Sequence, residues 1–379
     1  MIFGVVLGIA ILVLLVVVHE LGHAIVARRN GVVVEEFGIG FPPKAWGRKL
    51  KNGIYFTLNW LPLGGFVKLQ GEHDAATGKG DYGAATFWQK TKILLAGVLM
   101  NWVVAAVLIS ILSVVGLPKI LPNQFSIASD TREVLKPVQV VAVQDDSPAE
   151  KAGLKTGDVI LEVGGKSITE SQQLAHVTED KAGQTVQILY SRDSQQKTTK
   201  AELRSSDEAT SGYLGISQGQ QATLHSTWSA PIVGVGTTVQ FSYETVKGVG
   251  VTLWKALSGT VMQLSPDQKA RDTGKANIDD AKNSVAGPVG VVGVIFPAAG
   301  QAGPTQVIFL TAIISLTLAV MNILPIPALD GGRWFTMALF RLLKKDLTKD
   351  REESIQAVGF LVLVGLIILV TISDVGRLM

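Results

Sequence analysis

The chain of 379 residues contains no cysteine. Disulfide bonds therefore cannot stabilise any of its domains, and no thiolate can bind a metal ion or act as a nucleophile. A transition-metal site in this protein must be built from histidine, aspartate and glutamate. Without cysteine, the sequence also carries no information about the redox compartment in which the protein works.

Charged residues are scarce as well. They make up 17% of the chain, whereas a soluble domain usually carries about 25%, and the mean hydropathy is +0.34. Four stretches contain no Asp, Glu, Lys or Arg: Ile2–Val18, Ile93–Leu117, Asn283–Leu329 and Ser354–Ser373. Because apolar stretches of about 17–25 residues can cross a bilayer, we expect a multi-pass membrane protein. This composition argues against a secreted soluble enzyme, a nucleic-acid-binding protein and a disordered scaffold.

These stretches predict four transmembrane helices. The first, within Met1–Ala27, has no basic N-terminal region and no small-residue cleavage site, so we expect a retained span and not a cleaved signal peptide. The others are Ile93–Leu117, about Thr305–Leu324 and about Ile355–Ser373. Residues 283–304 are too rich in Gly and Pro for a regular helix, and irregular backbone at membrane depth must be buried in protein or line a cavity.

The distribution of basic residues predicts the orientation. Residues 28–92 contain ten Lys and Arg against five acidic residues, and residues 333–353 contain six against four. The intervening residues 119–305 contain seventeen against nineteen. Cytoplasmic loops carry an excess of Lys and Arg. We therefore expect the first two segments in the cytoplasm, and the long insert and both termini outside.

A β-like pattern covers residues 31–70. Val32–Phe41, Ile54–Trp60 and Gly64–Gln70 are separated by turns rich in Pro and Gly. The aromatic residues of this segment suit a membrane interface: Trp46, Tyr55, Phe56, Trp60 and Phe66. We predict a membrane-associated β-hairpin segment, and the alternative is a small cytoplasmic hairpin domain.

The strongest motif is His19-Glu20-Leu21-Gly22-His23 within the first span. A spacing of four places both imidazoles on one face of a helix, where they can bind one metal ion. Glu20 would then lie beside the open coordination position as a general base. Ionisable groups within a bilayer are costly unless they are paired or bound to metal, which favours this reading. The alternative is a polar helix end whose histidines are satisfied by neighbouring groups.

A catalytic zinc site usually has three protein ligands and one water, so a third ligand is required. The other histidines lie in polar segments: His73, His176 and His225. Asp330 closes the third apolar stretch, where Pro325 and Pro327 break the helix and two glycines allow a sharp turn. Asp330 is therefore the favoured third ligand, and the alternative is a solvated Asp in a helix-ending turn.

Taken together, these motifs resemble the site-2 protease family of intramembrane zinc metalloproteases. The histidine motif in a first span pairs with N-x-x-P-x-P-x-L-D-G-G at residues 322–332. Further matches to family motifs are Pro62–Lys68 (P-x-G-G-F-V), Ala96-Gly97 with Asn101 (A-G-x-x-x-N) and Gly287–Gly290 (G-P-V-G). One departure is Val98, where relatives often have proline. The resemblance covers nearly the whole chain.

The resemblance implies a Zn²⁺ ion bound by His19, His23 and Asp330, with Glu20 as the catalytic base. It also implies that Asn322 helps to bind substrate. The predicted substrate-binding residues are Asn322, Pro325, Gly64, Gly65, Phe66, Gly287 and Pro288. The implied activity is the second cleavage of a membrane-anchored single-span protein, such as an anti-sigma factor or a signal-peptide remnant. It would take place in a bacterial plasma (inner) membrane, in contact with lipid and without nucleic acid.

The insert carries a second signature. Ser147–Gly165 resembles the core of a bacterial PDZ domain. The expected elements are a helix at Pro148–Ala152, a strand at Val159–Val163, a groove helix at Ser171–Glu179 and strands at Thr185–Arg192 and Lys200–Arg204. A loop resembling the carboxylate-binding loop follows this core, which suggests a circular permutation: Tyr213, Leu214, Gly215 and Ile216. Two interpretations stay open, namely peptide capture by strand addition and a rigid module that screens substrates by size.

The predicted fold class is thus a multi-pass α-helical membrane protein with a β-hairpin segment and an inserted extracytoplasmic α+β PDZ domain. The predicted divisions are 1–118 and 283–379 for the two halves of the protease core, 125–218 for the PDZ domain and 228–282 for a juxtamembrane segment. Within the last, Ile232–Leu264 has apolar residues at helical spacing. This predicts an amphipathic helix on the outer membrane face, or a helix packed on the PDZ domain or the spans.

Two other functions are compatible with parts of the sequence. A metal-stabilised scaffold without catalytic activity would bind zinc and use the PDZ domain to recruit a partner. A transporter could use the helix broken at Pro325 and Pro327, although the inverted repeat found in many transporters is missing. The pairing of the two metal-binding motifs favours the protease.

Overall fold

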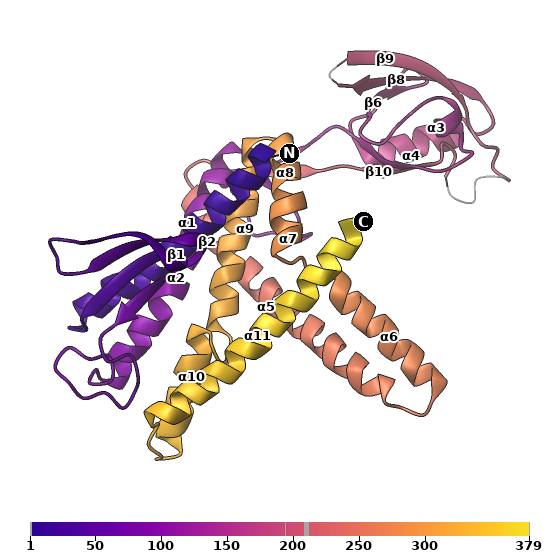
Figure 1. Ribbon diagram of the computed structural model, residues 1–379. Helices are drawn as coiled ribbons and strands as arrows, with labels where there is room; N and C mark the ends of the chain where they lie inside the picture. Colours follow the sequence, from indigo (N-terminus) through magenta and orange to yellow (C-terminus); the bar gives the residue numbers. More distant parts are fainter. Residues whose placement is uncertain (1, 194, 208–211, 379) are drawn as a thin grey trace. The chain divides into compact units, whose positions relative to one another are not determined.

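The computed structural model describes residues 2–193, 195–207 and 212–378 (Figure 1). The chain forms two compact units, one made of Met1–Leu112 with Pro231–Met379 and the other of Ser113–Ala230. Each unit has its own hydrophobic core. We refer to the second unit as the insert.

Helices dominate the first unit. They are α1 (Ile2–Arg29), α2 (Phe87–Val115), α5 (Ala230–Gln263), α6 (Gln268–Asn283), α7 (Pro288–Gly290), the π-helix η1 (Val291–Ile295), α8 (Phe296–Ala302), α9 (Pro304–Ile323), α10 (Asp330–Leu342) and α11 (Lys349–Leu378). Within the described residues, α1, α2, α9 and α11 are long and apolar enough to cross a membrane, and α6 with the bent segment 288–302 would be a fifth candidate. The four predicted spans correspond to these four helices, except that α2 ends at Val115, two residues before the predicted end at Leu117. The number of membrane crossings stays a prediction.

Small residues allow close packing around α1 and α2. A Cβ atom on Gly4 or Gly8 of α1 would lie 2.6 Å from Pro297 or 2.7 Å from Phe296, so glycine lets α8 approach. Between α2 and α9, the hydroxyl of Ser315 donates a buried hydrogen bond of 2.8 Å to the carbonyl of Asn101. Small residues and buried hydrogen bonds of this kind hold helices together where lipid removes the hydrophobic driving force.

The segment before α9 is helical from Pro288 to Ala302, although we expected irregular backbone over residues 283–304; only residues 284–287 and Gly303 lie outside the helices. The helix is not regular, because the π-helix η1 interrupts it and Gly303 ends it at a φ of +107°. Its beginning contacts α11, where the Asp374 carboxylate accepts a hydrogen bond of 2.8 Å from the amide of Gly290. A Cβ atom on Gly287 would lie 2.6 Å from that carboxylate. Glycine in the G-P-V-G motif therefore makes room for Asp374.

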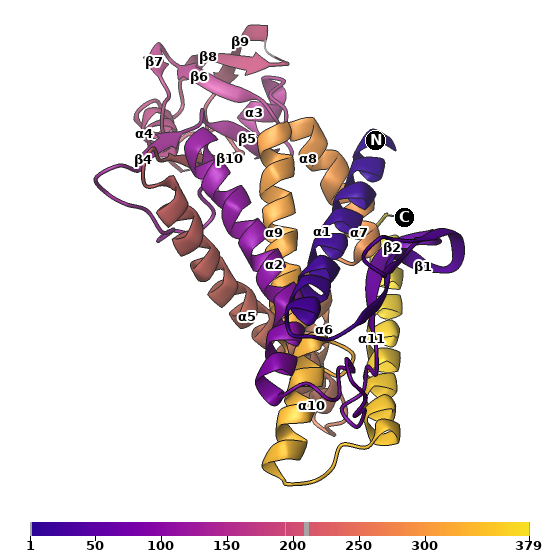
Figure 2. The ribbon, with the colours of Figure 1, turned by 90° about the vertical axis from the view of Figure 1, so that its left-hand side faces the viewer.

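Helix α5 packs against a span, which is one of the two positions expected for residues 232–264. The indole of Trp102 in α2 donates to the hydroxyl of Ser242 at 3.1 Å, and Gly234 contacts Ser110 of α2. Figure 2 shows α5 running beside α2. Apolar side chains spaced three, four or seven residues apart stay exposed along α5 and at the residue after it: Ile232, Val235, Val239, Tyr243, Val246, Leu253, Leu257, Val261 and Leu264. This stripe is the part of the helix that suits lipid.

The predicted β segment forms a two-stranded sheet of β1 (Val34–Lys49) and β2 (Tyr55–Leu69). Both strands bend, so that Ile39 lies opposite both Gly65 and Leu58. The first part of β1 therefore lies between two parts of β2, and the part of β2 that ends at Leu69 is at the outside. Trp46 and Trp60 are exposed, which suits a membrane interface, and the membrane association of this sheet stays a prediction.

The insert contains two sheets among its described residues. The larger has the order β10-β5-β6-β8-β9, with β7 beside β6, and the smaller has the order β3-β11-β4. The bounds are β3 (Leu117–Pro118), β4 (Arg132–Leu135), β5 (Gln139–Val143), β6 (Val159–Val163), β7 (Lys166–Ser167), β8 (Thr185–Arg192), β9 (Gln195–Glu202), β10 (Ile216–Gly219) and β11 (Ala222–His225), with helices α3 (Pro148–Lys151) and α4 (Ser171–Asp180). The predicted strands β6 and β8 are reproduced, whereas β9 begins before the predicted Lys200. Strand β10 follows the core in sequence and pairs with β5, the arrangement that a circular permutation predicts.

A buried ion pair stabilises the insert. The Asp158 side chain is 1% exposed and accepts two hydrogen bonds of 2.7 Å from the Arg192 guanidinium and one of 2.8 Å from the amide of Lys155. Burial opposes the ionisation of Asp158, but these hydrogen bonds outweigh it and hold the pKa of Asp158 below its usual value. The folded state therefore binds fewer protons than the unfolded state. The resulting stability is present above about pH 4 and is lost as the pH falls through the lower folded-state pKa.

We predict that Asp158→Asn lowers the free energy of unfolding of the insert by about 3 kcal/mol at pH 7, because it leaves the Arg192 charge without its partner. The variant should also lose the acid-dependent decrease in stability that Asp158 causes below about pH 4. Hydrogen exchange of insert peptides in the full chain measures both. The matched control is Asp180→Asn, which breaks the exposed pair with Lys166 and should cost less than about 1 kcal/mol. Equal effects of the two substitutions would contradict the prediction.

Candidate active site

Helix α1 brings His19 and His23 to the same side of one helical turn. Both side chains are buried, and their Nε2 atoms lie 3.1 Å apart. The Nδ1 atom of His23 is 2.7 Å from the carbonyl oxygen of Ile93 in α2. Since a carbonyl only accepts, Nδ1 carries the proton, and the lone pair of Nε2 is free to bind a metal ion.

Asp330 reaches the histidines from the other half of the first unit. It is the first residue of α10, which follows the turn after α9. Its Oδ2 atom lies 3.0 Å from Nε2 of His19 and 3.3 Å from Nε2 of His23. A Cβ atom on Gly331 or Gly332 would lie 2.1 or 1.9 Å from backbone atoms at the end of α9 and in the turn. The two glycines therefore allow the tight turn that places Asp330.

The donor set fits a zinc ion. Zinc bound to nitrogen and oxygen has bonds of about 2.0 Å in tetrahedral geometry, which separates neighbouring ligand atoms by about 3.3 Å. The three atoms of His19, His23 and Asp330 lie 3.0–3.3 Å apart. They form a potential metal-binding group within the described residues. Three protein ligands leave a fourth position for water or substrate, as in catalytic zinc sites.

Two further glycines, Gly97 in α2 and Gly22 in α1, allow α2 to approach the side chains of His19 and His23. A Cβ atom on Gly97 would lie 2.4 Å from Nε2 of His23 and 2.6 Å from Cε1 of His19. A Cβ atom on Gly22 of α1 would lie 2.6 Å from the carbonyl oxygen of Ala96. The A-G pair of the second-span motif is thus explained by close packing, of Ala96 on Gly22 and of Gly97 on the predicted metal ligands. Asn101 of the same motif is fully buried, and its side-chain amide has no hydrogen-bond partner among the described residues.

A cavity of about 570 Å³ opens onto Glu20 and onto two of the three candidate ligands, His23 and Asp330. Glu20, His23 and Asp330 line it together with Phe66, Val67 and Leu69 of β2. A Cβ atom on Gly65 would lie 3.6 Å from Cγ of Glu20, so this part of β2 passes directly beside the predicted base. The cavity also extends to the first turns of α11, where Glu352, Glu353 and Gln356 line it.

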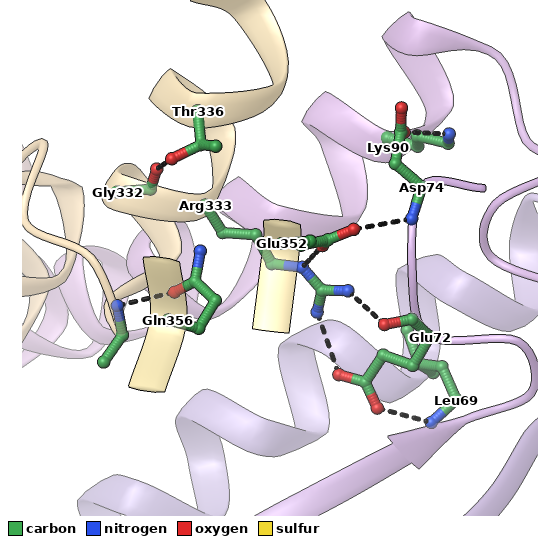
Figure 3. Close-up of polar contacts among 10 residues, drawn as sticks. Leu69, Glu72, Asp74, Lys90, Gly332, Arg333, Thr336, Glu352 and Gln356 are labelled. Atoms are coloured by element: carbon green, nitrogen blue, oxygen red, sulfur yellow. Dashed lines mark hydrogen bonds and ion pairs between the residues drawn. The ribbon is translucent and has the colours of Figure 1, made fainter. Parts of the chain in front are cut away.

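Glu72, Arg333 and Glu352 line the far part of the cavity and form with Asp74 a polar cluster, which we call the Arg333 cluster (Figure 3). Arg333 donates to the Glu72 carboxylate at 2.9 Å, to the Glu72 backbone carbonyl at 2.6 Å and to the Glu352 carboxylate at 3.1 Å. Glu352 also accepts a bond of 2.7 Å from the amide of Asp74. The guanidinium carbon lies 4.7 Å from the centre of the Tyr82 ring. The cluster joins α10, α11 and the loop that follows β2.

Sequence reasoning missed the Arg333 cluster. Glu72 and Glu352 lie in charged segments without a motif, and their separation in the chain conceals their proximity. One signal was available, because Arg333 directly follows the D-G-G of the ligand motif and lies three residues after Asp330. A helix places residues three apart on the same side.

The other predicted site residues are more dispersed. Phe66 lines the cavity, and Gly65 lies beside Glu20. The Asn322 side chain donates 3.0 Å to the carbonyl of Leu318 within α9, and Pro325 lies in the turn before α10. Gly287 contacts α11 through Asp374, so the structure does not bring it, or the adjoining Pro288, to the metal ligands. The substrate-binding roles of all these residues, including Gly64, stay predictions.

The predicted ligand loop of the insert precedes β10 at the edge of the larger sheet. Leu214 is buried in the insert core, Tyr213 packs against that core, and Ile216 begins β10. Gly215 has a φ of +75°, which glycine adopts without strain. These positions are compatible with a peptide groove, and ligand binding there stays a prediction.

We predict that Gly97→Ala abolishes zinc binding in the purified chain while the helices remain folded, because the added methyl group would overlap both imidazoles. Zinc content by mass spectrometry and helicity by circular dichroism measure the two effects. The matched control is Gly365→Ala in α11, where a Cβ atom would meet nothing within 4 Å. Zinc bound stoichiometrically by Gly97→Ala would show that α2 does not restrict the ligands.

Comparison with known proteins agrees with this geometry. The profile of peptidase family M50 matches residues 7–366. A Clostridium perfringens protein with a provisional zinc metalloprotease name is 32% identical over 363 residues, which cover 95% of each chain. The zinc metalloprotease RasP of Shouchella clausii is 25% identical over 453 aligned positions, covering 98% of each chain. Among solved structures, the PDZ domain of an SdrC-like protein from Listeria monocytogenes matches 22% of this chain and 86% of its own, with 30% identity and a TM-score of 0.20.

The matches to the family profile and to full-length relatives extend over nearly the whole chain. These matches include the histidine motif, the aspartate motif and the segments between them, which the structure brings together. The chain therefore belongs to peptidase family M50, the site-2 proteases, and is a zinc-dependent metalloprotease of the membrane.

Proposed function

We propose that this protease cleaves the transmembrane segments of single-span membrane proteins, with His19, His23 and Asp330 as zinc ligands and Glu20 as general base. The observation that supports this most directly is the grouping of His19, His23 and Asp330 beside a cavity that Glu20 also lines, among helices long and apolar enough to cross a membrane. A scaffold without catalytic activity has no need for a carboxylate in the cavity beside the ligands. A transporter has no need for a three-ligand site with an open position.

The proposed reaction is hydrolysis of a peptide bond. Zinc, when bound, supplies Lewis-acid activation of water and of the scissile carbonyl. Glu20 accepts the proton of the attacking water and then delivers it to the leaving amine. Its place on α1, between the two histidines in sequence, holds it beside the open coordination position without a separate structural element.

Strand addition provides a route for the substrate into this site. The carbonyl groups of a helix are hydrogen-bonded and shielded, so a transmembrane helix must unwind before water can attack it. The outer part of β2 lines the cavity at Phe66, Val67 and Leu69, and Gly65 lies beside Glu20. An unwound segment that pairs with this edge would obtain backbone hydrogen bonds in place of those it lost, and its peptide bonds would pass the base.

The charge distribution supports a bacterial plasma membrane in which the active site lies toward the cytoplasm and the insert lies outside. In this orientation the insert meets substrates whose outer parts have already been shortened. It would select them either by binding their exposed terminus or by excluding proteins with large ectodomains. Membrane-anchored regulators such as anti-sigma factors and remnants of signal peptides are the two substrate classes of this kind.

We predict that Glu20→Gln retains zinc but lowers cleavage of a single-span reporter in proteoliposomes by at least about 100-fold, the usual contribution of a general base. Zinc analysis and fragment quantification measure the two properties. Glu353→Gln is the matched control, because it changes another carboxylate that lines the same cavity and should leave activity within about twofold of wild type.

Accumulated substrates identify the physiological class. Membrane proteomes of cells with wild-type and Glu20→Gln protein should differ in single-span fragments that persist in the variant. Full activity of Glu20→Gln would rule out the proposed mechanism.

A further inference from the structure

The outer edge of β2 is open over a short length. The amide of Gln70 points inward and donates to the carbonyl of Val33 at 2.9 Å, whereas the amide of Leu69 points outward. Successive backbone groups along a strand alternate in direction. Val67 and Gly65, two and four residues before Leu69, therefore direct their amide and carbonyl groups toward the same outer edge, which lines the cavity.

At Leu69 the edge is closed by a side chain. The Glu72 carboxylate accepts the outward amide of Leu69 through Oε2 at 3.2 Å. Its other oxygen, Oε1, accepts from Arg333 at 2.9 Å, and the same guanidinium donates to the Glu72 backbone carbonyl. A bidentate guanidinium fixes the position and direction of the group that it holds. Glu72 thus occupies the position that the next residue of an added strand would take.

The point at which Glu72 closes the edge, which we call the stop, lies at a defined distance from Glu20, the predicted base. Gly65 is beside Glu20, and Leu69 is four residues further along β2. At about 3.3 Å per residue, this is about 13 Å of strand. A substrate segment pairing with Gly65 and Val67 would meet Glu72 at the end of this length, and it could not slide further along the edge.

We propose that Glu72, held by Arg333, is a specificity-determining residue that ends the substrate-binding edge of β2 and sets which peptide bond lies beside Glu20. The inference rests on the proposed function, because it requires a substrate strand on this edge. Arg333 acts as a positioning residue for Glu72. Glu352, from α11, holds Arg333 from the other side.

The test maps cleavage sites in a single-span reporter by mass spectrometry, with the full-length zinc-loaded chain in proteoliposomes. Glu72→Ala frees the amide of Leu69 and extends the open edge. We expect a new cleavage site displaced by about two residues from the wild-type site, because a shift of one residue would turn every side chain to the wrong face. Glu72→Gln keeps an acceptor oxygen for Leu69 and should cleave at the wild-type site.

Two further variants distinguish the loss of the Glu72–Leu69 bond from the loss of any carboxylate in the cavity. Glu72→Asp keeps the charge that faces Arg333 but is one methylene group shorter, so it should lose the bond to Leu69 and show the same displacement as Glu72→Ala. Glu353→Ala removes another cavity carboxylate and should leave the site unchanged. An unchanged site in both Glu72→Ala and Glu72→Asp would overturn this inference alone. Absence of cleavage by the wild-type chain would overturn the proposed function and this inference with it.

Discussion

The placement of His19, Glu20 and His23 on one turn of an apolar helix is the constraint on which the rest of the first unit depends. Ionisable groups in a membrane span are costly unless a partner or a metal ion compensates them. Helix α1 supplies no such partner for the two imidazoles, and Asp330 comes from the far end of the chain. The fold must therefore bring the α9–α10 turn against α1, and α2 closes the other side.

Space, more than conformational freedom, explains the glycines at this junction. Gly22 and Gly97 let α1 and α2 touch at the metal ligands, while Gly331 and Gly332 let α10 begin against the end of α9. None of the four has a positive φ, so another residue could adopt their backbone conformation. What a side chain could not do is share the volume occupied by imidazole rings and carbonyl groups. The motifs A-G and D-G-G thus reflect steric requirements of the predicted metal site.

The grouping of His19, His23 and Asp330 was predictable from the sequence, because each part of it depends on a short stretch of chain. A spacing of four residues on a helix fixes the relation of His19 to His23, and an Asp at the end of an apolar run is rare enough to draw attention to Asp330. The positions of β6 and β8 were predictable as well, since alternation and turn residues determine them locally. The packing of α5 on α2 was one of two open alternatives, because an apolar stripe does not specify what covers it.

The Arg333 cluster and the register of β2 could not be predicted, since both depend on contacts between distant segments. Nothing in the charged segments around Glu72 and Glu352 distinguishes these two acids from their neighbours, and only the folded chain shows that Arg333 lies between them. The double pairing of β1 with two parts of β2 likewise follows from bends that alternation does not encode. It is this double pairing that leaves the edge at Gly65–Leu69 facing the cavity.

The predicted metal ligand Asp330 and the residue that holds Glu72 at the end of that edge belong to the same helix. Asp330 and Arg333 lie on the first turn of α10, separated by about 4.5 Å along the helix axis. In the proposed site, Asp330 fixes where the metal ion would sit, and Arg333 fixes where Glu72 would end the substrate-binding edge. A displacement of α10 would move both together, so the length of strand between the reacting bond and the stop would change less than either position. On the proposed function, the substrate is an unwound apolar segment whose side chains offer few polar features by which to select one bond, so the protease would need a structural reference of this kind.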